Sequence, residues 1–252
     1  MILLEVPEKR DQNHDLWLGG TTAAVAGFVN VCSVIAFFAF ASNVTGHVAI
    51  FAEELVKGHW HQFSVVFVWL LAFIGGAFFA NLSVTWLGLR APRTARAIPL
   101  VVEILLLVGI GYYGFNHYTE TLTETEYLVG LLLFTMGLQN SMVATVSKGI
   151  VKTTHLTGLS TDLGMEISMI LQPRYRKDER LRFKLKLHLL IFAMYVTGGV
   201  LGGLLFLSVG FRAFHLAAML LGFILVHDLI MARVNASAVM FPRAAKVPRL
   251  RG

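Results

Sequence analysis

Two short segments combine a Thr-Gly pair with acidic residues, and they are the parts of this chain best suited to bind a solute. They cover residues 42–55 (SNVTGHVAIFAEEL) and 154–167 (THLTGLSTDLGMEI). A threonine at a helix N-cap accepts a backbone N–H, and a glycine lets another group approach the main chain. If both helices start inside the protein, their positive dipole ends attract a negative or carbonyl-bearing solute. The residues predicted to bind this solute are Thr45, Gly46, Thr157 and Gly158.

Two asparagines lie well inside apolar runs, shortly before the Thr-Gly segments. Asn30 closes a G-x-x-N motif that begins at Gly27, and Asn140 closes a second one that begins at Gly137. A buried amide needs hydrogen-bond partners. Each asparagine can bind the other, the main chain of a Thr-Gly segment, or the solute. We therefore add Asn30 and Asn140 to the predicted substrate-binding residues.

Several ionisable residues fall within or beside apolar runs, where charge is costly and often marks function, including proton relays. Asp162 and Glu166 are four residues apart, so they share one face of a helix. Glu103 lies inside an apolar run and could pair with His227 of a later one. The residues predicted to couple protons or to gate are Glu54, Asp162, Glu166, Glu103 and His227.

The sequence offers no clear set of ligands for a metal or a cofactor. Cys32 is the only cysteine, so we expect neither an internal disulfide nor a cysteine-based metal site. His59 and His61 flank Trp60, but no third ligand accompanies them. We therefore expect no metal and no cofactor. We also expect no nucleic-acid partner, because the basic residues form short stretches between apolar runs and no recognition motif is present.

The composition places these residues in a lipid bilayer. The chain has 252 residues, of which 56% are hydrophobic and 14% charged, and its mean hydropathy is +0.69. A soluble domain carries roughly 25% charged residues. A helix needs roughly 20 apolar residues to cross the hydrocarbon core. Six runs qualify, at residues 18–40, 62–88, 97–115, 126–146, 186–209 and 213–233.

Basic residues indicate which connections face the cytoplasm. They gather before the first run, between the second and third, between the fourth and fifth, and after the sixth. The alternate connections, at 41–61, 116–124 and near Gly210, hold few. Because Lys and Arg mark cytoplasmic loops, we expect a multi-pass protein of the cytoplasmic (inner) membrane with both termini inside.

The two halves of the chain repeat one order of features. Each half has a G-x-x-N motif on a span, then Thr-Gly, then a glutamate, then a span with paired glycines, then a last span. In this alignment Gly75-Gly76 corresponds to Gly198-Gly199. Three crossings in each half force the second half to be inverted, which is a common plan of secondary transporters. The predicted divisions are 1–17 (cytoplasmic tail), 18–118 (first repeat), 119–125 (outer linker), 126–234 (inverted repeat) and 235–252 (basic tail).

The Thr-Gly segments are too short to span and too apolar for ordinary loops, so they are expected to be two short re-entrant or interfacial helices. The full prediction is an all-α membrane protein with about six transmembrane helices. The glycine-rich faces, which include the G-x-x-x-G pair Gly198 and Gly202, suit internal packing or a homodimer.

The runs AGFVNVCSV, NVTGHVAIF, MGLQNSMVA and TTHLTGLSTDLG resemble the YoaK-type family of bacterial membrane proteins, whose function is not known. The resemblance covers nearly all of residues 18–234. It implies a protein of the bacterial cytoplasmic membrane and supplies no substrate. Many members carry Asp where this chain has Asn30, so an acidic proton carrier at that position is not implied here.

Three functions remain open on the sequence. The first is a transporter or channel for a small polar or anionic solute, with its site between the two Thr-Gly helices near the membrane midplane. The second is a membrane-embedded enzyme acting on a lipid, which needs an acid–base set such as His47 or His155 with Glu or Asp. The third is a scaffold or regulatory protein, in which the Thr-Gly pairs only cap and pack helices. A two-fold cavity favours the first, and a one-sided cleft lined by histidine favours the second.

Overall fold

The computed structural model describes residue 4 and residues 11–240, with side chains described through residue 231. Throughout this part of the chain the regular structure is helical, as predicted. Most of the two predicted tails lies outside the described residues. The elements are α1 (Gln12–Phe37), α2 (Val44–Lys57), α3 (Trp60–Gly88), α4 (Pro92–Asn116), α5 (Leu122–Val146), α6 (Leu156–Ile170), α7 (Glu179–Val209), the 3-10 turn η2 (Gly210–Arg212) and α8 (Ala213–Met240).

Five of the six long helices begin earlier than the predicted apolar runs, and polar caps start three of them, α1, α5 and α7. α1 begins at Gln12 and not at residue 18, since Asp11 and His14 form a reciprocal capping box. α7 begins at Glu179 and not at residue 186, since Asp178 accepts two backbone N–H groups of its first turn. α3, α4 and α5 begin at residues 60, 92 and 122, also a few residues early. Each predicted run therefore overlaps one long helix, and five of the six runs start too late.

Most of the buried apolar core residues lie on α1, α4, α5 and α8. Two helix pairs cross closely, α1 with α7 and α3 with α5, and we term them the core pairs. Their backbones touch through glycines. A Cβ added to Gly27 of α1 would come closer than 3.0 Å to the carbonyl of Tyr195, and one on Gly137 of α5 would meet the carbonyl of Phe73 in the same way. The partner helices contribute a second glycine each, Gly198 against Ala24 and Gly76 against Phe134. Such approach is the usual way that helices associate tightly in lipid.

These contacts correct the predicted correspondence of the paired glycines. Gly198 and Gly76 make the equivalent contacts, whereas Gly75 meets only the ring of Phe134, at 3.8 Å. The alignment of α3 with α7 was therefore one residue out. The α7 glycines at 198, 199, 202 and 203 are buried against α1. A homodimer through that face would have to displace α1.

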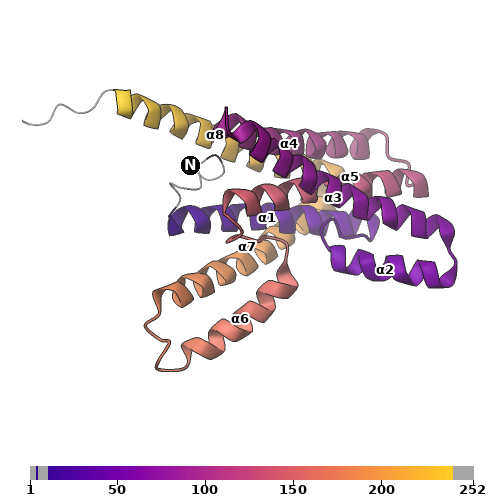
Figure 1. The fold of residues 1–252 in the computed structure, drawn as a ribbon. Coiled ribbons are helices and arrows are strands. Elements are labelled where there is room, and N and C mark those ends of the chain that lie inside the picture. The colour runs from indigo at the N-terminus through magenta and orange to yellow at the C-terminus, as the bar shows by residue number, and fades with distance from the viewer. Residues whose placement is uncertain (1–3, 5–10, 241–252) are drawn as a thin grey trace, which may run out of the picture.

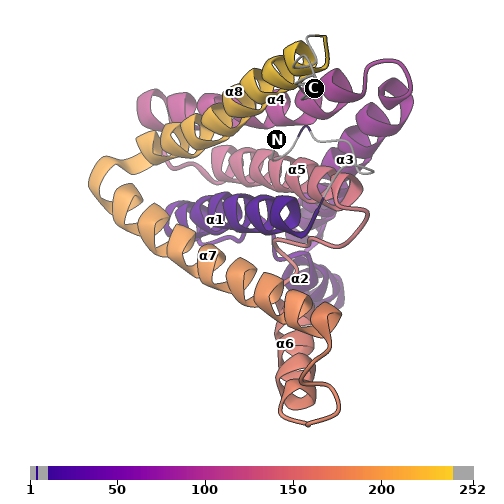
Figure 2. The ribbon, with the colours of Figure 1, turned by 90° about the vertical axis from the view of Figure 1, so that its left-hand side faces the viewer.

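Among the described residues, five helices are long and apolar enough to cross a membrane. The last of them runs from Glu179 to Met231, over 53 residues, and so includes α7, η2 and most of α8. A straight helix of that length would be about 80 Å long, far more than a bilayer. Figure 2 shows instead that the chain turns back at η2, so that α7 and α8 form the two arms of a V.

The two short helices have related positions. α2 packs on α3, and α6 packs on α7. Figure 1 shows both helices starting near the middle of the molecule and running away from each other, α2 to the right and α6 to the lower left. Before each of them the chain leaves a long helix and doubles back. Residues 38–43 follow α1 and form the first break, and residues 147–155 follow α5 and form the second break.

Candidate functional site

The start of α2 is capped by a residue other than the one predicted. Asn43 is the N-cap, and its side-chain oxygen accepts the N–H of Gly46 at 3.1 Å. Thr45 is the second residue of the helix and is exposed. The prediction that Thr45 is the N-cap is therefore wrong, because the helix begins at Val44. Gly46 faces its own cap, since an added Cβ would lie 2.7 Å from the Asn43 amide nitrogen.

The start of α6 has the same design with a weaker cap. His155 is the N-cap and makes no side-chain cap hydrogen bond. Thr157 is again the second residue and is exposed, so its predicted role as N-cap is also wrong. A Cβ on Gly158 would lie 2.8 Å from the His155 ring. The first N–H groups of α6 thus lack the side-chain acceptor that α2 has.

The side chain of Asn30 stabilises the first break, between α1 and α2, by hydrogen bonds to its main chain. Its side-chain oxygen accepts the N–H of Ala41 at 2.9 Å and the N–H of Ser42 at 3.2 Å, and the Ser42 hydroxyl lies 3.2 Å from the same oxygen. The Tyr195 side chain of α7 lies within hydrogen-bonding reach of both Asn30 and Ser42. Of the three predicted alternatives, Asn30 therefore binds main chain next to the Thr-Gly segment.

Asn140 occupies the corresponding place on α5 but does not hold the second break in this way. It is half-buried, three residues after the glycine that crosses α3. The bond that closes the second break is made by Ser147, whose hydroxyl accepts the N–H of Val151 at 3.0 Å.

Each short helix has a glutamate that meets a histidine. Glu54 of α2 lies 2.8 Å from His59, and Glu166 of α6 lies 3.0 Å from His188 of α7. The two sites differ in burial, because His59 is exposed whereas Glu166 is buried and His188 is mostly so. The neighbouring Glu53 pairs with Lys57 on the surface.

The predicted pairing of Glu103 with His227 is wrong. Both oxygens of Glu103 are buried within the bundle and have no hydrogen-bond partner among the described residues. His227 instead lies 3.2 Å from its neighbour Asp228, which also accepts the N–H of Leu4 at 2.8 Å. Asp228 of α8 thus binds Leu4, and neither it nor His227 reaches Glu103 among the described residues.

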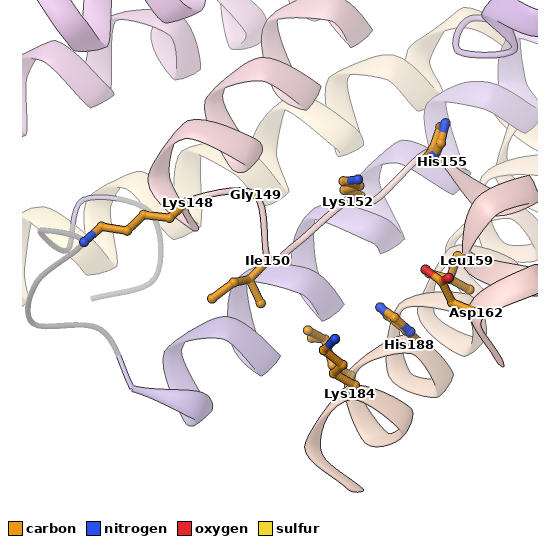
Figure 3. Close-up of a pocket in the computed structure, with 10 residues that line it drawn as sticks. Lys148, Gly149, Ile150, Lys152, His155, Leu159, Asp162, Lys184 and His188 are labelled. Carbon is orange, nitrogen blue, oxygen red and sulfur yellow. The ribbon is translucent and has the colours of Figure 1, made fainter. Parts of the chain in front are cut away.

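A cavity of about 330 Å³ lies between the second break, the start of α6 and α7. Figure 3 shows its polar side chains coming from these three segments, with Asp162 of α6 facing Lys184 and His188 of α7. His188 connects the cavity to the buried Glu166. The lining residues are Lys148, Gly149, Ile150, Lys152, His155, Leu159, Asp162, Lys184, Leu187 and His188.

The structure brings some predicted residues together and leaves others apart. Asp162 lines the cavity, Gly158 lies against His155 of its wall, and Glu166 reaches it through His188. His47, one of the two histidines named for the enzyme hypothesis, is buried against Trp69, and its ring nitrogen lies 2.8 Å from the carbonyl oxygen of Phe40. Among the described residues no group of three or more His, Cys, Asp or Glu side chains could hold a metal ion.

The comparisons with known proteins give a family without an activity. A family model described as "Protein of unknown function (DUF1275)" matches residues 18–227. The chain belongs to the DUF1275 family. No curated protein and no solved structure matches it. As a member of DUF1275 with several apolar helices of spanning length, it is a multi-pass membrane protein.

Proposed function

We propose that this DUF1275 protein is a transporter or channel for a small polar or anionic solute, with both termini in the cytoplasm of a bacterium. The observation that carries the proposal is the pair α2 and α6, which start near the middle of the molecule and run toward opposite ends. Irregular backbone at such depth is tolerated where it is buried in protein or lines a watery cavity. The residue runs shared with the YoaK-type proteins support the placement in the bacterial inner membrane.

The proposal includes six crossings arranged as two inverted repeats. Its support is the equivalence of the two core pairs: α1 crosses α7 as α5 crosses α3, with glycines at matching positions. α2 on α3 likewise corresponds to α6 on α7. Counting the two arms of the V as separate crossings gives three in each half, as an inverted design requires.

In this mechanism the solute passes between the starts of the two short helices. Gly46 and Gly158 keep the helix starts narrow, the N–H groups of α6, which lack a side-chain cap, face the solute, and Asn140 offers its amide. Asn30 positions the first break and does not bind the solute itself. Protonation of Glu54, Asp162 and Glu166 changes the charge along the path, and the two glutamates exchange protons with their histidine partners.

Flux through proteoliposomes tests the site. Wild-type protein should speed the reswelling of osmotically shrunken vesicles in at least one member of a panel of neutral and anionic solutes. Gly46→Leu and Gly158→Leu should each lower that rate about tenfold or more, because overpacking by about 1–3 kcal/mol acts at the path itself. Gly164→Leu is the matched control on α6, since a Cβ there meets nothing within 4 Å. Unchanged flux in both test variants would refute the site.

Cysteine labelling tests the inverted design. In a Cys32→Ala background, a cysteine in place of His59, just after α2, should react with an impermeant maleimide added to intact cells. A cysteine in place of Tyr175, between α6 and α7, should react only after the cells are permeabilised. Glu120 and Arg90 provide the outer and inner reference positions. Labelling of the His59 and Tyr175 positions from the same side would contradict the inversion.

A membrane-embedded enzyme acting on a lipid is the second candidate, and one observation favours it. The cavity beside α6 lies on one half of the chain only and is lined by His155 and His188, the second of which is paired with Glu166. A transporter captured open to one side has such a cavity too. The enzyme and transporter hypotheses differ in their products. If the protein only transports, mass spectrometry after incubation with inner-membrane lipids should show no new lipid species.

A further inference from the structure

The cavity beside α6 carries an excess of positive charge. Lys152 of the second break and Lys184 of α7 line it, and so do the imidazole rings of His155 and His188. Among the described residues that line it, Asp162 is the only acid. Lys148 also lines it but has a further interaction of its own. Without Lys148, two lysines and one carboxylate line the cavity, and Glu166 bonds His188 behind its wall.

The start of α6 adds backbone donors to this charge. His155 lines the cavity and is the N-cap of a 15-residue helix, but its ring accepts no N–H of the first turn. Leu159, whose N–H bonds the His155 carbonyl at 3.0 Å, also lines the cavity one turn later. Among the described residues, the N–H groups of residues 156–158, between these two lining residues, have no acceptor, and such helix starts attract anions.

The corresponding surface of the first half carries none of these charges. Counting from the two Thr-Gly pairs and from Gly76 and Gly198, the cavity positions of Lys152, His155, Lys184 and His188 fall on Phe40, Asn43, Gln62 and Val66. Asn43 also uses its side chain to cap α2. The basic cavity is thus a property of one end of the molecule and not of the shared fold.

The dimensions and the walls of the cavity restrict the ligand. About 330 Å³ holds a small molecule, and Leu159 and Leu187 form buried apolar walls beside the charged groups. Lysine ammonium groups and free helix N–H groups together are the usual partners of phosphate oxygens. A carboxylate fits the same donors with fewer oxygens and thus uses fewer of them.

We propose that this cavity is a binding site for a phosphate group, held by Lys152, Lys184 and the N-terminus of α6. The group belongs either to a free phosphate-bearing solute or to the headgroup of an anionic phospholipid. The site exists whether or not the protein transports its ligand, so binding and flux can fail separately.

Two binding arms distinguish the two sources. In the first, the purified full-length protein in phosphate-free buffer is titrated calorimetrically with inorganic phosphate. In the second, native mass spectrometry counts phosphatidylglycerol and phosphatidylcholine molecules retained by the protein. Saturable phosphate binding identifies a free solute. Retention of phosphatidylglycerol over phosphatidylcholine, without phosphate binding, identifies a headgroup. Binding in neither arm overturns the proposal.

Charge-neutral variants test the residues. Lys152→Gln and Lys184→Gln should each weaken binding about tenfold, because each removes a charge-assisted hydrogen bond. Lys186→Gln is the matched control, being an exposed lysine of α7 that does not line the cavity, and should change affinity less than twofold. Equal weakening in all three variants would indicate general surface charge and would overturn the site.

A measurement on the unaltered protein makes the result independent of folding in the variants. Acetic anhydride labelling followed by peptide mass spectrometry reports the accessibility of each lysine. The ligand found above should protect Lys152 and Lys184 and leave Lys186 unprotected. Equal labelling of all three lysines with and without the ligand would contradict the proposal.

Discussion

Replacing Gly137 by alanine should lower the melting temperature of the detergent-solubilised protein by several degrees. The new Cβ would overlap the carbonyl of Phe73 on α3, which is backbone and cannot rotate away. The two helices must move apart, at a cost of about 1–3 kcal/mol or more. Loss of fluorescence-detected monodisperse protein after heating gives the measurement.

The equivalent helix pair, α1 with α7, provides a second variant for the same test. Gly27→Ala should cause a similar loss, because its Cβ would overlap the Tyr195 carbonyl in the same way. Gly109→Ala on α4 and Gly222→Ala on α8 are the controls, since a Cβ at either position meets nothing within 4 Å. These controls should keep or slightly raise the melting temperature, because alanine favours helix over glycine. A Gly137→Ala protein as stable as the controls would contradict the close crossing.

Replacing Asn30 by leucine should loosen the first break and destabilise the protein by about 1–3 kcal/mol. The N–H groups of Ala41 and Ser42 lose their shared acceptor in a buried place, and unpaired buried donors carry that cost. Amide hydrogen exchange should become faster across residues 38–46, while the exchange of α5 stays as it was.

Two matched variants separate this effect from simple loss of an amide. Asn30→Asp keeps an acceptor oxygen and should retain most of the protection of residues 38–46. Asn140→Leu removes the corresponding amide of the second half, which does not close its break, and should cost less stability. If Asn140→Leu nevertheless lowers flux, that result supports its proposed contact with the solute. Equal stability losses at Asn30 and Asn140 would contradict the distinct roles.

The sequence predicted the helical elements well because hydropathy records them directly. Runs of about 20 apolar residues are uncommon outside membranes, and the two short apolar segments could be neither spans nor ordinary loops. Helix starts were predicted less well. The Asn43 and Asp178 caps act on main-chain groups whose position depends on where the chain turns, and a hydropathy pattern does not contain that information.

The candidate site was only partly predictable for a related reason. Asn30 was chosen as a buried amide. Its partners, the N–H groups of Ala41 and Ser42, reach it only because the chain doubles back after α1, and the sequence pattern does not show that turn. Glu103 and His227 were paired on the assumption that their helices meet. α4 and α8 do pack together, but the two side chains do not bond. Lys152 and Lys184 were interpreted as loop charges, because the break, α6 and α7 form a cavity only in three dimensions. Their one available signal was the absence of lysine at the matching positions of the first half.

The pairing of α1 with α7 and of α3 with α5 has a consequence for how the protein is made. Each tight pair joins a helix of the first half to one of the second half, and α7 leaves the ribosome much later than α1. α1 must therefore wait in the lipid, its glycine-lined groove unfilled, until α7 has been inserted. Neither half produced as a separate polypeptide can bury this groove, whereas the two halves made together in one cell can complete each other.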